Sequence, residues 1–194
     1  MGGDYLLFVG RLVPEKAPDR LLEAFSTIEG QTKLVLAGGS SFTDDYVRLI
    51  HSLAASDPRV VLAGYVYGDL LEELYTNAAA FVLPSLLEGL PLTLLEAISY
   101  GIPVVASDIP PHVEVLGGDG PGRRLVVAGD QASLVATLQH ALRDLEGERA
   151  GAERLSADVV AAHRWDDAVA ATEAVYRSVL ARPREAPRPR EGRA

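Results

Sequence analysis

RVVLAGYVYGDLLEELYTNAAAFVLPSLLEGLPLTLLEAISYGIPVVAS, residues 59–107, holds three short apolar runs with two amphipathic segments between them. The apolar runs, at 59–64, 80–84 and 103–107, are continuous rather than alternating, which is typical of strands buried on both faces of a parallel sheet. The segments between them have helical spacing. Strands and helices that alternate in this way predict right-handed crossovers in a doubly wound α/β sheet.

The same alternation continues on both sides of this stretch. Further strands are expected at 5–10, 33–38 and 124–129, which makes a six-stranded, mostly parallel, Rossmann-like sheet with helices on both faces and more helices at the C-terminal end. Asp166 is expected to cap the last helix. The helices are expected at 17–28, 43–56, 68–79, 91–101, 110–117, 131–145, 148–162 and 166–181.

The composition favours one compact domain followed by a tail. The chain has 194 residues, of which 48% are hydrophobic, enough for a substantial core. We expect the domain to span 1–181, and the Pro- and Arg-rich residues 182–194 to be disordered. The tail holds five Arg and two Glu and contributes +3 to the net charge of −9, so the rest carries −12. An acidic body argues against nucleic acid as the main partner, because phosphate backbones need a basic surface.

Two absences from the sequence narrow the function classes further. There is no Cys, which excludes disulfides, a thiolate nucleophile and a Cys-built metal site. There is also no apolar run of about 18 residues, which a membrane span needs, and no charged-then-apolar leader at the N-terminus. We therefore expect a cytoplasmic protein.

The first candidate site follows the strand at 5–10. Gly10 ends this strand, and Arg11 and Lys16 bracket a short loop before a helix that starts near Pro18. Two cations beside a helix N-terminus favour a diphosphate, because Arg offers a fork of donors, Lys a point charge and the helix its free N–H groups. The alternative is two solvated cations, with Lys16 paired to Glu15. Neither a GxGxxG nor a Walker loop is present.

The second candidate site follows the strand at 80–84. Glu88 precedes the next helix, and Glu96 lies about one and a half turns inside it, so their carboxylates could straddle a group up to about 10 Å long. The N–H groups of Gly89 and Leu90 are expected to point outward where Pro91 begins the helix. The alternatives are an ordinary cap-region acid with an exposed helix acid, or the paired acids of a glycosidase.

Several segments together resemble one known family. FVGRLVPEKAPDRLLEAF (8–25), KLVLAGGS (33–40), the stretch quoted at 59–107 with its continuation to 116, and WDDAVAATEAVY (165–176) are similar to the C-terminal, donor-binding half of a family 4 retaining glycosyltransferase. Enzymes of that family have the GT-B architecture, with two Rossmann-like domains and a cleft between them. The resemblance runs through almost the whole chain in the family's order and spacing.

The resemblance implies a role for each polar residue of both sites. Arg11 and Lys16 would bind the diphosphate of a nucleotide sugar without a metal ion. Glu88 would bind hydroxyls of the donor sugar and, with Arg11 and Lys16, form the catalytic set. Glu96 would bind the 2′ and 3′ hydroxyls of the ribose.

The resemblance also implies a role for the backbone. Gly89 and Leu90 would meet the phosphate and the sugar through their amides, and Gly10 and Pro91 would line the same site. The backbone around Tyr65 and Val66 would meet the base.

One residue departs from the family's pattern, and one half of the enzyme is not in the chain. The family usually has Gly after the lysine, where this chain has Ala17, so the tightness of that loop is in doubt. The family's N-terminal domain binds the acceptor and is absent here. Two functions therefore stay open. The chain is either the donor half of a transferase, inactive until it meets that domain or a partner subunit that supplies it, or a non-catalytic nucleotide-sugar-binding or assembly subunit.

The remaining polar and aromatic residues are expected to be structural. They are Tyr75 and Tyr100 in the core or at its rim, Leu70 and Leu74 in the core, His112 at the surface with the cleft as the alternative, Asp108 as the cap of the helix near Pro110, and Trp165 and Tyr176 as anchors of the last helix.

Overall fold

The computed structural model of the protein describes residues 5–39 and 44–181. The predicted tail, 182–194, lies outside the described residues, as does residue 43 at the start of a predicted helix. The strands form one parallel sheet in the order β3-β2-β1-β4-β5-β6. They are β1 Tyr5–Val9, β2 Lys33–Ala37, β3 Val60–Gly64, β4 Ala80–Leu83, β5 Val104–Ser107 and β6 Arg123–Val126. This confirms the doubly wound α/β class and all six predicted strands.

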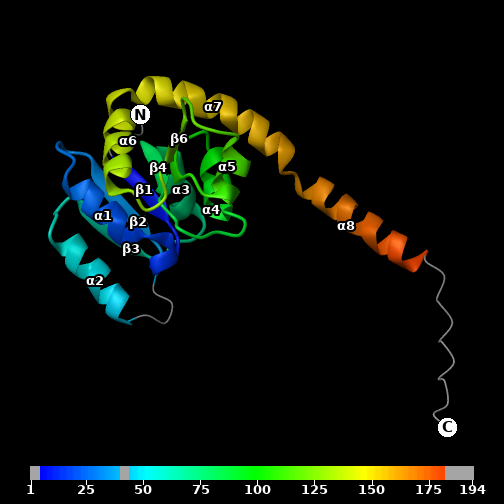
Figure 1. Cartoon of the computed structure of the whole chain (residues 1–194), viewed down its shortest axis with the longest axis horizontal. Coiled ribbons are helices and arrows are strands. Elements are labelled where there is room, and N and C mark those ends of the chain that lie inside the picture. The colour runs from blue at the N-terminus through cyan, green and yellow to red at the C-terminus, as the bar shows by residue number, and fades with distance from the viewer. Residues whose placement is uncertain (1–4, 40–43, 182–194) are drawn as a thin grey trace, which may run out of the picture. The chain divides into compact units, whose positions relative to one another are not determined.

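Helices cover both faces of this sheet (Figure 1). Helices α1, α2 and α6 lie on one face and α3, α4 and α5 on the other, because the crossovers reverse direction after β3. The helical segments are η1 Pro14–Lys16, α1 Pro18–Ser26, α2 Asp44–Ala55, α3 Asp69–Asn77, α4 Leu92–Ser99, α5 Pro110–Leu116, α6 Gln131–Arg143, α7 Leu145–Ala162 and α8 Trp165–Leu180.

The core follows the continuous apolar runs of the sequence. Strands β4 and β5 are buried along their whole length, and the three central residues of β1 are fully buried. Strand β3 does not meet the expectation of burial on both faces, since Val61 is 43% exposed. It is one of the two edge strands of the sheet and has a neighbour on one side only.

Two predicted helix caps are wrong, and one helix starts three residues earlier than predicted. Helix α8 begins at Trp165 with Arg164 as its N-cap, so Asp166 lies in the first turn and is not the cap. Asp108 does not cap α5 either, because its Oδ1 accepts a hydrogen bond of 2.8 Å from the Ala128 N–H and ties two loops together. Helix α7 begins at Leu145 instead of residue 148, since the Asp144 carboxylate accepts from the Gly147 N–H in its first turn.

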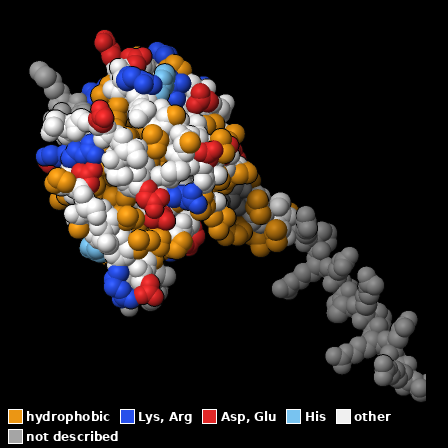
Figure 2. Space-filling view, turned by 60° about the vertical axis from the view of Figure 1, so that its left-hand side comes forward, with side chains coloured by type: hydrophobic (Ala, Val, Ile, Leu, Met, Phe, Trp, Pro, Cys, Tyr) orange, Lys and Arg blue, Asp and Glu red, His pale blue; other side chains and the backbone are white. Residues whose placement is uncertain are grey.

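The chain divides into two compact units between Val160 and Ala161. Helix α8 belongs to the second unit and buries none of its side chains, and Figure 2 shows the hydrophobic side chains along it. Trp165 and Tyr176, which were expected to anchor this helix, are 83% and 66% exposed. Among the helices of the described residues, none is long and apolar enough to cross a bilayer.

Candidate functional site

The loops after β1 and β4 meet at the carboxyl edge of the sheet. Strand β1 pairs with β2 on one side and β4 on the other, so the order of the strands reverses at this point. In open α/β sheets, ligands bind at such a switch point. The two loops are joined directly, because the Leu86 N–H donates to the Glu15 carbonyl at 2.8 Å.

An ion pair between Lys16 and Glu88 is the centre of this edge. Lys16 Nζ lies 2.6 Å from each carboxylate oxygen of Glu88, and the two side chains are 19% and 5% exposed. Ser85 Oγ donates a third hydrogen bond to Glu88 Oε1 at 2.7 Å. The alternative pairing of Lys16 with Glu15 is therefore wrong, since 3-10 helix η1 aims the lysine at the β4–α4 loop.

The loop that carries Lys16 closes through a left-handed residue. Ala17 has φ 50° and ψ 43° and is buried. Among the described residues it is the only non-glycine residue with positive φ. This conformation costs an L-residue roughly 1–2 kcal/mol, a cost that Gly avoids. The physical reason for a glycine here is thus backbone conformation, and Ala17 adopts the tight turn at some strain.

Tyr75 of α3 holds the carboxylate of Glu96, which lies on α4. The Tyr75 hydroxyl donates to Glu96 Oε2 at 2.9 Å, and the ring stacks on Tyr100 with centroids 5.2 Å apart. Burial, first, and then the negative charge and hydrogen bond of Glu96 raise the pKa of Tyr75, so the phenol stays a donor. Both tyrosines were expected in the core or at its rim, and this is confirmed, since Tyr75 is buried and Tyr100 is 39% exposed. The contact of Tyr75 with Glu96 was not foreseen.

The start of α4 offers free donors beside the ion pair. The N–H groups of Gly89 and Leu90 find no acceptor among the described residues, and a Cβ at Gly89 would meet no atom within 4 Å. Helix α4 begins at Leu92 with Pro91 as its N-cap, one residue later than the predicted start at Pro91. The Arg11 side chain is exposed and forms no ion pair with a described residue.

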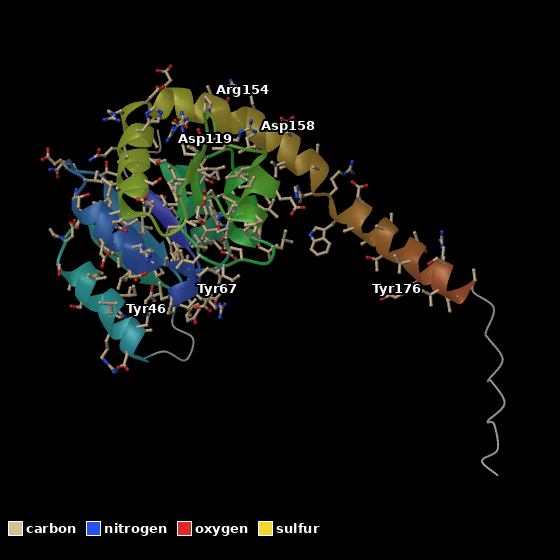
Figure 3. The ribbon with its side chains drawn as sticks, in the orientation of Figure 1. Tyr46, Tyr67, Asp119, Arg154, Asp158 and Tyr176 are labelled. Atoms are coloured by element: carbon tan, nitrogen blue, oxygen red, sulfur yellow. The ribbon has the colours of Figure 1, made fainter. Side chains whose placement is uncertain are left out.

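The ends of β1, β2 and β3 approach closely at the same edge. A Cβ on Gly38 would lie 1.8 Å from the Gly10 carbonyl oxygen, and one on Gly39 would lie 2.3 Å from the Tyr65 ring. Tyr65 stacks with Tyr67, whose exposed ring is labelled in Figure 3. Val66 between them is half-buried.

The helix that follows this edge differs in one residue from its prediction. Leu70, expected in the core, is 57% exposed in the first turn of α3. Leu74 packs partly buried against the core, as predicted.

His112 is buried and does not lie at the surface as predicted. Its Nδ1 lies 2.9 Å from the Ser107 carbonyl oxygen. Burial, first, lowers the pKa of His112, and the nearby charges of Glu88 and Lys16 shift it in opposite directions. The signal for burial was present in the sequence, because Val115 and Leu116 follow at the spacing of one helix face.

Among the described residues, no three or more His, Cys, Asp or Glu side chains form a cluster that could hold a metal ion. The metal-free site expected from the sequence stays a prediction. What the geometry brings together is Lys16, Glu88 and the free amides of Gly89 and Leu90, with Glu96 further along α4.

The chain is similar in sequence to several known proteins. A family model described as glycosyl transferases group 1 matches residues 1–154. D-inositol 3-phosphate glycosyltransferase of Mycolicibacterium smegmatis is 34% identical over 174 residues, which are 87% of this chain and 39% of that protein. O-antigen chain mannosyltransferase B of Escherichia coli is 31% identical over 148 residues, 74% of this chain and 37% of that protein.

Solved structures show the same fold. Sucrose-phosphate synthase from Thermosynechococcus elongatus matches with a TM-score of 0.82 and 27% identity over 91% of this chain and 45% of that chain. Anabaena HepE in complex with UDP and glucose matches with a TM-score of 0.80 and 19% identity over 93% and 49%. The chain thus spans less than half the length of the curated relatives it matches. The Rossmann-like fold of the GT-B type is confirmed, and the chain belongs to the group 1 glycosyl transferases.

Proposed function

We propose that this chain is the donor-binding domain of a retaining glycosyltransferase of family 4, which moves a sugar from a nucleoside-diphosphate sugar to an acceptor hydroxyl. The observation that carries the proposal is the Lys16–Glu88 ion pair beside the free N–H groups of Gly89 and Leu90. The relatives named as glycosyltransferases and the HepE neighbour, which was solved with UDP and glucose, support it.

The bonding capacity of the ion pair matches such a ligand. An ammonium has three donors, and Lys16 uses two of them on Glu88, so one is left for a phosphate oxygen. A carboxylate has about four acceptor sites. Lys16 and Ser85 take three of those on Glu88, which leaves one for a sugar hydroxyl. Glu88 therefore recognises the sugar while it orients the cation.

The diphosphate is neutralised by side chains and amides in this proposal. Arg11 and Lys16 supply two positive charges, and the Gly89 and Leu90 amides supply donors at the positive end of α4. The same groups stabilise the diphosphate that leaves when the sugar is transferred. This is why we propose that no metal ion is needed.

Glu96 takes the other end of the donor. Tyr75 occupies only Oε2, and the exposed remainder of the carboxylate can accept from the vicinal hydroxyls of a ribose. The base would lie along Tyr65 and Val66, after β3 and next to β2 in the sheet. One acid holds each end of the nucleotide sugar, and the diphosphate lies between them.

Transfer requires a second domain in this proposal. The chain spans less than half of its relatives, and rate comes from closing two walls on both substrates, which orients them and excludes water. The acceptor domain, or a partner subunit that supplies it, would complete the enzyme in the cytoplasm. The other candidate is a non-catalytic nucleotide-sugar-binding subunit, which the same binding residues would serve.

Calorimetry tests the proposal directly. The chain is titrated with UDP, GDP and ADP and with their glucose conjugates, and the strongest ligand identifies the base. Lys16→Ala should weaken that ligand about 5- to 150-fold, or about 1–3 kcal/mol, because a charge-assisted contact is lost. Lys33→Ala is the matched control, since Lys33 is exposed at the opposite end of β2. No binding of any of these ligands at millimolar concentration would contradict the proposal.

A further inference from the structure

His112 lies behind the site as a fully buried polar side chain in the first turn of α5. The proposed roles of the donor-binding residues do not use it. The ring makes two contacts through Nδ1, at 2.9 Å to the Ser107 carbonyl oxygen and 3.2 Å to Ser107 Oγ. Its Nε2 is buried and has no partner among the described residues.

A chain of hydrogen bonds runs from His112 to the ion pair. Ser107 Oγ donates to the Ser85 carbonyl oxygen, and Ser85 Oγ donates to Glu88 Oε1 at 2.7 Å. Ser85 and Ser107 are both fully buried. Ser107 ends β5, and Ser85 lies two residues beyond the end of the neighbouring strand β4. Each serine hydroxyl in this chain donates to one oxygen that only accepts, so the direction of these two bonds is fixed.

The contacts decide which nitrogen carries the proton. A carbonyl oxygen only accepts, so the contact with Ser107 requires the proton on Nδ1. The neutral ring then has its lone pair on Nε2. A second proton would turn Nε2 into a buried donor without an acceptor and would bury a charge, and both are costly.

The charges that face His112 come from two other segments. Glu88 of the β4–α4 loop and Lys16 of η1 both act on the ring, and they are the two partners of the ion pair. Glu114 on α5 itself is not among the groups that act on it. A proton on His112 would therefore draw Glu88 away from Lys16 and repel the lysine.

We propose that His112 is a positioning residue, which in its neutral, Nδ1-protonated form holds Ser107 and Ser85 so that Glu88 keeps one acceptor site turned toward the donor sugar. The inference rests on the proposed function of Glu88. It adds that recognition of the sugar, and not of the nucleoside diphosphate, depends on the proton state of a buried histidine. Sugar recognition then weakens in acid.

Two measurements on the full chain test this inference. The first is a long-range ¹H–¹⁵N NMR spectrum of the wild type, which identifies the tautomer without any ligand. We expect Nδ1 to carry the only ring proton of His112, and Nε2 to stay unprotonated, down to below pH 6.5, the ordinary pKa of the ring. A proton on Nε2 at neutral pH would overturn the inference, whatever the protein binds.

The second measurement is calorimetry with UDP and UDP-glucose, GDP and GDP-glucose, or ADP and ADP-glucose, whichever pair binds, between pH 5 and pH 8. His112→Leu removes the Nδ1 donor. It should weaken binding of the glucose conjugate about tenfold at pH 7.5 and leave the affinity for the nucleoside diphosphate unchanged. His112→Asn retains a donor near the Nδ1 position and should restore most of that affinity, without the loss in acid that the wild type shows. His140→Asn, at a half-exposed histidine on α6, is the matched control.

The outcomes separate this inference from the proposed function. If the wild type binds no pair, the proposed function fails and the NMR result still decides the tautomer. If His112→Leu is folded and binds the sugar conjugate as the wild type does, or loses both ligands equally, the positioning role is wrong. If His112→Leu does not fold, His112→Asn decides, because an unchanged loss in acid would contradict the inference.

Discussion

Replacing Lys16 with methionine removes the ammonium from Glu88 and leaves a carboxylate that is 5% exposed with Ser85 as its remaining partner. Breaking a fully buried ion pair by removing one partner costs about 3–5 kcal/mol. Lys16 is 19% exposed, so water can reach the carboxylate. We therefore expect a loss of about 2–3 kcal/mol in the free energy of unfolding.

The double variant Lys16→Met/Glu88→Gln isolates the pair. It leaves no unpaired charge, and replacing a buried ion pair by neutral groups is often close to neutral for stability. The double variant should therefore be more stable than Lys16→Met alone, with a coupling energy of about 1–2 kcal/mol in the mutant cycle.

Urea unfolding at pH 7, followed by far-UV circular dichroism, measures the four free energies. Lys33→Met is the control for losing a lysine at an exposed position and should change stability by less than about 0.5 kcal/mol. A cost for Lys16→Met no larger than that for Lys33→Met would contradict a stabilising ion pair. Additivity of Lys16→Met and Glu88→Gln within about 0.5 kcal/mol would contradict it as well.

Three further predictions concern other parts of the chain. Tyr75→Phe keeps the ring stack but removes the donor to Glu96, so it should weaken all ribonucleotides, by less than Glu96→Ala does in the same calorimetry; an unchanged affinity would contradict the role of Tyr75. Ala17→Gly should leave the free energy of unfolding within about 1 kcal/mol, since relief of the left-handed strain offsets the entropy of glycine, whereas Ala17→Val should destabilise by more in the same urea assay; equal effects would argue against strain at this turn. The chain alone should transfer no sugar in an assay with lipid and sugar acceptors, and should gain activity when an N-terminal-domain protein is added; robust turnover alone would require an acceptor site within this chain.

The strands and most helices were predictable because each has a recognisable spacing of apolar residues between turn residues. Runs such as YLLFV and KLVLA are too short for typical helices and are bounded by turn residues, which favours strands buried in a sheet. Order in the sheet follows from the crossover rule once the strands are known. The errors in the helices were at their ends, where Asp108 and Asp144 bind loop or first-turn amides that the sequence does not identify.

The site residues were predictable as single positions but not as partners. Lys16 and Glu88 lie 72 positions apart, and nothing in their spacing says that their loops touch. The contact of Tyr75 with Glu96 depends in the same way on packing between segments that lie apart in the sequence. Exposure of Trp165 on α8 could not be predicted either, since an amphipathic pattern marks an apolar face without saying what covers it.

In the proposed function, Glu88 holds the sugar and Glu96 the ribose of one nucleotide sugar. The most direct test is calorimetry of Glu88→Ala and Glu96→Ala with a nucleoside diphosphate and with its glucose conjugate. Glu96→Ala should weaken both ligands by about 1–3 kcal/mol, whereas Glu88→Ala should weaken only the glucose conjugate. A loss of free nucleoside diphosphate affinity in Glu88→Ala as large as that in Glu96→Ala would contradict the assignment of the two ends.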